Sequence, residues 1–150
     1  MLAASILYSV ILSAILTATG GSYSSNANQS TLESIIKVYP IMSFVIFGIV
    51  GPISEELTYR VGLFSLCSRV NKVFGYIVSL IIFALIHFSW TSIGTKDFVT
   101  ELYNLPSYLI AGFGLAFIYD KGGIGASFIA HSLNNIYSVV SVIISTKASV

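Results

Sequence analysis

Two adjacent glutamates, Glu55 and Glu56, lie in the middle of a long apolar stretch of the sequence. An ionisable side chain at the centre of a bilayer-spanning segment costs roughly 2.5 to 3.5 kcal/mol on insertion scales, so it seldom persists without a function. Arg60 follows one helical turn later, and the two histidines, His87 and His131, occur on other apolar segments. The fold must therefore enclose a small set of polar side chains inside an apolar protein.

Composition places the chain in a membrane. Of its 150 residues, 55% are hydrophobic and only 9% are charged, whereas soluble domains carry about 25% charged residues. We therefore expect one integral membrane domain over residues 1–150, with the lipid bilayer as its surroundings. The net charge of +1 and the lack of a basic cluster predict no nucleic-acid partner. Cys67 is the one cysteine and cannot form an internal disulfide.

Apolar segments long enough to cross a bilayer, which takes about 20 residues, indicate the fold class. We expect an all-α protein, a polytopic bundle of about five membrane-spanning helices with the site in its core. The expected helices cover residues 2–19, 35–64, 73–90, 102–119 and 123–144. Residues 20–31 are predicted as a polar loop. The connections at 65–72, 91–101 and 120–122 hold most of the charged residues outside the candidate site. The part of the chain that bears the motifs is about 40–140. The first segment lacks a preceding basic region, which favours a transmembrane helix over a signal peptide.

The paired glutamates begin a local pattern with Tyr59 and Arg60. Residues i and i+4 share a helix face, which pairs Glu55 with Tyr59 and Glu56 with Arg60. We expect Arg60 to neutralise Glu56 and to leave Glu55 facing a cavity, with Tyr59 as a supporting residue. The alternative is a purely structural ion pair that locks the packing of helices.

Pro52 precedes the glutamates on the same expected helix. Proline cannot donate a backbone hydrogen bond, so we expect it to free the carbonyl of Gly48 and to kink the helix. Gly48 and Gly51 should allow another helix to approach closely.

The two histidines provide further candidate groups. His87 ends the pattern Phe83-Ala84-Leu85-Ile86-His87, and it could simply reach the membrane interface beside Trp90. His131 and Asn135 are spaced i, i+4 and share a face. His131 also belongs to a polar seam at heptad-like spacing, whose serines we expect to form interhelical hydrogen bonds. The seam consists of Ser127, His131, Asn134, Ser138, Ser141 and Ser145.

Depth in the membrane links these residues. At 1.5 Å per residue, Glu55, His87, His131 and Asn135 all fall in the middle third of a core about 30 Å thick. A buried glutamate can act as a general base on water, and a nearby histidine can orient that water or protonate a leaving amine. His131 and Asn135 could donate hydrogen bonds to a developing oxyanion. These groups would suffice to hydrolyse a peptide bond.

A zinc site is the competing interpretation. Glu55, His87 and His131 form a set of ligand types known from catalytic zinc sites. The sequence contains no HExxH or comparably tight spacing of ligands. We therefore expect no metal and no other cofactor, with zinc as the alternative.

Three motifs in order resemble a known family. The pattern EExxxR is present at residues 55–60, FxxxH at 83–87 and HxxxN at 131–135. This series is similar to that of the CAAX protease and bacteriocin-processing (CPBP, or Abi) membrane proteins. The resemblance covers about residues 40–140. Family members usually have six to eight spans, whereas five are expected here.

The resemblance implies an intramembrane glutamate endopeptidase. It implies that Glu55 is the water-activating base with His87 as its partner, and that His131 and Asn135 stabilise the oxyanion. Glu56 and Arg60 would support the site.

We therefore expect a multi-pass membrane enzyme that cleaves a membrane-associated peptide or protein tail. The resemblance implies that its location is a bacterial cell membrane. The resemblance suggests CAAX-type processing, bacteriocin maturation or self-immunity. The alternatives are a catalytically silent scaffold for immunity or signalling, a zinc-dependent membrane protease, and a proton-coupled transporter.

Overall fold

The computed structural model describes residues 2–20 and 26–148. Every regular element within these ranges is helical, which confirms the predicted all-α class. The α-helices are α1 (Leu2–Ala18), α2 (Ala27–Val38), α3 (Pro40–Val45), α4 (Gly51–Glu56), α5 (Ser65–Ser68), α6 (Lys72–His87) and α7 (Asp97–Ala148). Two π-helical segments, η1 (Ile46–Val50) and η2 (Leu57–Phe64), flank α4, and η3 (Trp90–Ser92) is a short 3₁₀ turn.

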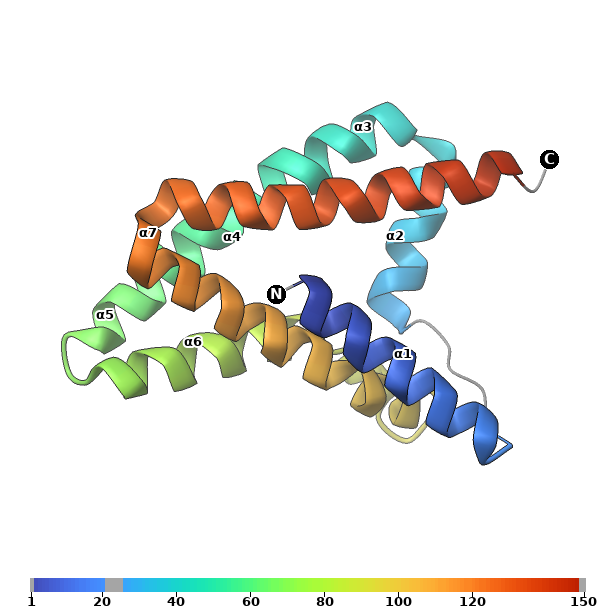
Figure 1. The fold of residues 1–150 in the computed structure, drawn as a ribbon, viewed down its shortest axis with the longest axis horizontal. Coiled ribbons are helices and arrows are strands. Elements are labelled where there is room, and N and C mark those ends of the chain that lie inside the picture. Colours follow the sequence, from blue (N-terminus) through green and yellow to red (C-terminus); the bar gives the residue numbers. More distant parts are fainter. Residues whose placement is uncertain (1, 21–25, 149–150) are drawn as a thin grey trace.

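The helix α7 organises the molecule. Its second half lies across α3 and α4, and α1 lies along its first half (Figure 1). The hydroxyl of Tyr8 on α1 donates to the backbone carbonyl of Tyr103 on α7 at 2.7 Å. Helices α2 and α6 also pack against α7, so most of the bundle contacts this one helix.

A single glycine bends α7 into two limbs. At 52 residues, a straight α7 would be about 78 Å long, more than twice the thickness of a bilayer core. Gly123 has φ 73° and ψ −174°, a conformation essentially restricted to glycine. The limbs therefore cover residues 97–122 and 124–148. The predicted connection at 120–122 is wrong, because these residues continue the first limb.

The surface of the bundle is apolar, as contact with lipid requires. Large apolar side chains face outward, including Ile41 at 83% exposed and Ile144 at 63%. Charged and amide side chains are instead among the most deeply buried. Two helical stretches, Pro40–Ser68 and Asp97–Ala148, are long and apolar enough to cross a membrane. Two shorter apolar helices, Ala3–Ala18 and Lys72–His87, accompany them, so the expected count of about five spans is not established.

The segment before α3 differs from the sequence prediction. We expected a polar loop over residues 20–31, but α2 already begins at Ala27; residues 21–25 lie outside the described part of the chain. The side chain of Asn26 caps α2 by accepting from the backbone N–H of Gln29 at 2.9 Å. The expected helix from residue 35 is broken at Tyr39, and Pro40 starts α3 at a position where its missing donor costs nothing.

Pro52 produces a π-helical turn. The backbone N–H of Gly51 reaches the carbonyl of Ile46, five residues earlier, instead of the α-helical partner four residues earlier. In this register the carbonyl that Pro52 leaves without a donor is that of Phe47, not that of Gly48 as predicted. The predicted close approach at Gly48 is confirmed, since a Cβ there would lie 2.8 Å from Cγ1 of Ile136 on α7.

Candidate active site

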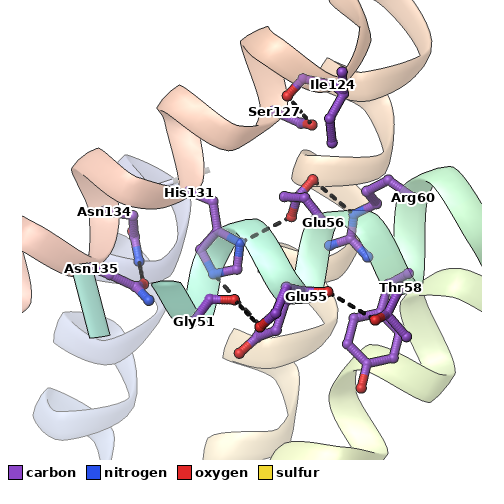
Figure 2. Close-up of polar contacts among 12 residues, drawn as sticks. Gly51, Glu55, Glu56, Thr58, Arg60, Ile124, Ser127, His131, Asn134 and Asn135 are labelled. Atoms are coloured by element: carbon purple, nitrogen blue, oxygen red, sulfur yellow. Dashed lines mark hydrogen bonds and ion pairs between the residues drawn. The ribbon is translucent and has the colours of Figure 1, made fainter. Parts of the chain in front are cut away.

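Glu56, at the end of α4, belongs to a fully buried cluster. Glu56 and Arg60 are both 0% exposed, and Arg60 Nε lies 3.6 Å from Glu56 Oε2. This is the i, i+4 pair expected from the sequence. The other carboxylate oxygen, Oε1, accepts a hydrogen bond from Nδ1 of His131 on α7 at 2.9 Å (Figure 2). Glu56 therefore joins two helices, a contact that sequence spacing did not predict.

Arg60 is held on three sides. Its Nη1 donates to Ser79 Oγ on α6 at 3.2 Å, and that hydroxyl donates to the backbone carbonyl of Tyr59. The guanidinium lies 4.7 Å from the ring centroid of Phe83, where a cation is attracted to the aromatic face. Tyr59 packs edge-on against the same ring at 5.8 Å. We call Glu56, Arg60 and Ser79 the sealed side of the site.

Glu55 faces the opposite way. Its side chain is 28% exposed and lines a cavity. Its Oε2 lies 3.8 Å from His131 Nε2 and 3.9 Å from His87 Nε2. Within the described residues this oxygen has no hydrogen-bond partner. The structure thus brings together one carboxylate and two histidines from three helices, and we call Glu55 and His87 the open side.

The proton positions on the two histidines follow from their partners. His87 Nδ1 lies 2.8 Å from the carbonyl of Phe83, and because a carbonyl only accepts, Nδ1 carries the proton. His131 Nδ1 donates in the same way to the Glu56 carboxylate. In the neutral rings, both Nε2 atoms therefore present lone pairs towards Glu55. Three acceptors converge on one point, which suits a hydrogen-bond donor such as a water molecule.

Asn135 lies on the same limb of α7 as His131. Its Nδ2 donates to the Phe47 carbonyl that Pro52 leaves free, at 3.0 Å. Its Oδ1 accepts from Nδ2 of Asn134 at 3.4 Å (Figure 2). These two contacts fix the orientation of the amide, and one N–H of Asn135 remains for another acceptor.

A cavity of about 1320 Å³ surrounds the open side. It is lined by Glu55, His87, His131 and Asn135, and also by residues of α1, α2 and both limbs of α7. Most of the polar seam lines it: His131, Asn134, Ser138, Ser141 and Ser145.

The seam serines behave differently from the sequence prediction. The hydroxyl of Ser141 donates to the Tyr137 carbonyl at 2.8 Å, and Ser127 donates to the Ile124 carbonyl at 3.2 Å. For these two serines, the expected interhelical hydrogen bonds are wrong, because each hydroxyl is satisfied within its own helix. Ser141 lines the cavity, and within the seam it is His131 that bonds to another helix.

Two further residues near the site were missed by sequence reasoning. The ring of Tyr108 stacks on His87 at 4.9 Å between centroids and 25° between planes. Glu101, predicted in a connection, is instead a buried residue of α7 at 1% exposed. Its carboxylate accepts from the backbone N–H groups of Ala27 and Ser89. A lone acidic residue and a lone tyrosine in apolar segments carry no spacing signal for such long-range contacts.

The described residues do not fit a metal ion as they stand. No group of three or more His, Cys, Asp or Glu side chains among them is placed to hold one. Ligands about 2.1 Å from a tetrahedral zinc ion lie about 3.4 Å apart. Glu55 Oε2 is 3.8 Å and 3.9 Å from the two histidine nitrogens, so these atoms would have to move inwards.

The chain is all-helical, its exterior is apolar and it encloses a carboxylate–histidine site. These features identify an integral membrane protein with a polar centre. A family model described as type II CAAX prenyl endopeptidase Rce1-like matches residues 37–137, more than half of the chain. The chain therefore belongs to this family of membrane proteases, as the resemblance of its motifs indicated.

Three bacterial proteins are similar to the chain, and the name of one of them agrees with this assignment. An uncharacterized protein of Mycoplasma capricolum is 32% identical over 93% of the chain and 40% of its own length. The UPF0177 protein YxdF of Lactococcus lactis is 34% identical over 76% of the chain and 58% of its own length. A Bacillus subtilis protein named "Putative membrane peptidase YdiL" is 29% identical over 75% of the chain and 42% of its own length.

The chain thus spans between two fifths and three fifths of the length of these three relatives. No solved structure shows a significant match.

Proposed function

We propose that the chain carries the active site of a multi-pass endopeptidase of a bacterial cell membrane. In this proposal the enzyme hydrolyses a peptide bond in a membrane-associated peptide or protein tail. The observation that carries the proposal is the unpartnered Oε2 of Glu55, which faces two histidine Nε2 atoms in a cavity. Membership of the CAAX endopeptidase family and the name of the Bacillus relative support the reaction class.

The first step activates water. A water molecule between Glu55, His87 and His131 donates one proton to the Glu55 carboxylate as its oxygen attacks the carbonyl carbon. The resulting oxyanion accepts the remaining N–H of Asn135. It also accepts from His131 Nε2 in enzyme that enters the reaction with this ring already doubly protonated. In that state Glu55 and His87 hold the water, the Nε2 proton stays on the ring throughout, and Glu56 balances the charge through its bond to Nδ1.

The second step breaks the C–N bond. The proton held by Glu55 passes to the leaving amine, with His87 Nε2 as the relay. The products are a new carboxyl group and a free amine, and the balance is the addition of one water molecule. No nucleophilic serine or cysteine and no metal ion is needed.

Two substrate classes fit this chemistry. A CAAX-type protein tail follows from the family, and a secreted peptide such as a bacteriocin precursor follows from the motif resemblance. Either would have to bring an extended backbone to Glu55 through the cavity.

The test is peptidase activity of the purified protein in nanodiscs, with a quenched-fluorescent peptide library. We expect cleavage by the wild type and a fall of about 10³-fold in Glu55→Gln and His87→Ala, the scale of lost general acid–base catalysis. Glu33→Gln is the matched control, because Glu33 lines the same cavity but its carboxylate is bound by Gln29 Nε2 at 3.0 Å.

Three outcomes would contradict the proposal. Loss of cleavage with a chelator and its recovery with zinc would replace the water mechanism by a metal-dependent one. Lack of cleavage, with a cellular phenotype that survives Glu55→Gln, would identify a silent scaffold. Proton flux in liposomes that depends on Glu55 would identify a transporter.

A further inference from the structure

His87 sits where the chain leaves helical geometry. It is the last residue of α6, and the chain leaves helical geometry at Phe88. A side chain at such a position has no following helical turn to hold it. Its Nδ1 bond to the Phe83 carbonyl fixes one edge of the ring. The Phe83 ring packs against His87 at 4.7 Å between centroids but tilted by 39°, so a parallel contact on the imidazole has to come from another residue.

Tyr108 supplies that contact. Its ring stacks on His87 nearly in parallel, from the first limb of α7. Such a contact restrains the tilt that aims His87 Nε2 at Glu55. An electron-rich ring also favours the positively charged imidazolium that forms when His87 takes up a proton.

The hydroxyl of Tyr108 is itself held by α2. It accepts from Asn26 Nδ2 at 2.8 Å and from Asn28 Nδ2 at 3.2 Å. Asn26 is only 2% exposed and caps α2 through its other amide atom. We call Asn26 and Asn28 the asparagine clasp.

Glu101 anchors the clasp. Its buried carboxylate accepts from the backbone N–H of Ala27, between the two asparagines, and from that of Ser89, two residues after His87. One side chain of α7 therefore ties the start of α2 to the chain just beyond His87. The clasp also lies outside residues 37–137, the part that the family model matches.

We propose that Tyr108, held by the asparagine clasp, is a positioning residue for His87. This proposal rests on the proposed peptidase function. Tyr108 acts through His87 and not on the substrate, so its loss should lower kcat and leave KM nearly unchanged. The start of α2 is then part of the working site.

Kinetics of matched variants test the role. We expect Tyr108→Leu to lower kcat about 10- to 100-fold, because small displacements of a catalytic group are costly. KM should change less than about twofold. Tyr108→Phe keeps the stacked ring and should recover kcat to within about fivefold of wild type. Tyr103→Leu is the control, since this tyrosine lies on the same limb and is 40% exposed.

The clasp has its own conservative variant. Asn26→Ser keeps a good helix cap but removes the amide donor to Tyr108. We expect Asn26→Ser and Tyr108→Phe each to lower kcat about two- to fivefold. The double variant should be no worse than Tyr108→Phe alone, since Tyr108→Phe already removes the hydrogen bond that Asn26→Ser breaks. Additive effects would contradict the clasp.

A spectroscopic readout separates this proposal from the peptidase function. The chain has only two histidines, so histidine labelled with ¹³C at Cε1 alone gives two NMR signals. Tyr108→Leu should shift the His87 signal and leave that of His131 in place, whereas Tyr108→Phe should shift neither strongly. An unmoved His87 signal, or equal losses of kcat in Tyr108→Leu and Tyr103→Leu, would overturn the proposal. If the wild type cleaves no peptide, the peptidase function fails while the His87 signal still decides the positioning.

Discussion

The sealed side and the open side begin at consecutive residues, yet they have opposite environments. Glu56 is fully buried and is bound by Arg60 and His131. Glu55 is partly exposed to a cavity, and its Oε2 has no hydrogen-bond partner in the described part of the chain. Adjacent side chains on a helix point about 100° apart. Two consecutive carboxylates can therefore face different surroundings, one the packed helices and the other the cavity. The difference teaches that a carboxylate tied to the scaffold by an arginine and a histidine holds the fold, and one that faces the cavity is available for chemistry.

The largest expected effect is on the open side. Glu55→Gln should lower kcat about 10³-fold, because the amide cannot take a proton from water. Its free energy of unfolding should stay within about 0.5 kcal/mol of wild type, because Oε2 makes no hydrogen bond that the change would break. Chemical unfolding in detergent, alongside the peptide assay, measures both. A large loss of stability would break the contrast between the two sides.

The matching change on the sealed side should act on stability. Glu56→Gln removes the charge that compensates Arg60, and an uncompensated buried charge costs about 3 to 5 kcal/mol. The same unfolding measurement checks this. If Glu56→Gln unfolds like the wild type and Glu55→Gln does not, the roles of the two glutamates are exchanged.

Asn135 should give an intermediate effect. Asn135→Ala removes a donor to the oxyanion and should lower kcat about 100-fold. It also leaves the Phe47 carbonyl unpaired. Asn134→Ala is the control, since Asn134 only orients the amide of Asn135 and should cost about tenfold or less. Equal losses in the two variants would show that orientation, not donation, is the function of Asn135.

The smallest effect concerns the helix contact behind Asn135. Gly48→Ala places a Cβ 2.8 Å from Ile136 Cγ1, and overpacking of this kind costs about 1 kcal/mol or slightly more. Gly125→Ala is the control, because nothing lies within 4 Å of its added Cβ. Thermal unfolding of both variants should separate them, and identical unfolding temperatures would argue against close packing at Gly48.

Local spacing accounts for what the sequence could predict. The all-helical class, the Glu56–Arg60 pair and the open position of Glu55 all follow from apolar runs and from i, i+4 geometry. The meeting of Glu55, His87 and His131 followed from equal depths in the membrane. The catalytic roles of these residues remain predictions.

Contacts that depend on helix rotation could not be predicted. The Glu56–His131 bond spans 75 residues, and spacing along one helix does not say which way another helix turns. The π-helical turns shift the register around Pro52, so the free carbonyl moved from Gly48 to Phe47. Glu101 gave no local signal because its partners are backbone N–H groups of distant segments.

The bend at Gly123 has a consequence for the shape of the cavity. Tyr108 lies on the limb before the bend, and His131 and Asn135 lie on the limb after it. Two walls of one chamber are therefore a single helix, and one residue sets the angle between them. Only glycine readily adopts this backbone conformation. A side chain at position 123 would therefore change the angle between the two limbs, and with it the width of the cavity, without contacting any residue that lines the cavity. The backbone conformation of one residue thus sets the width of the cavity that a substrate would enter.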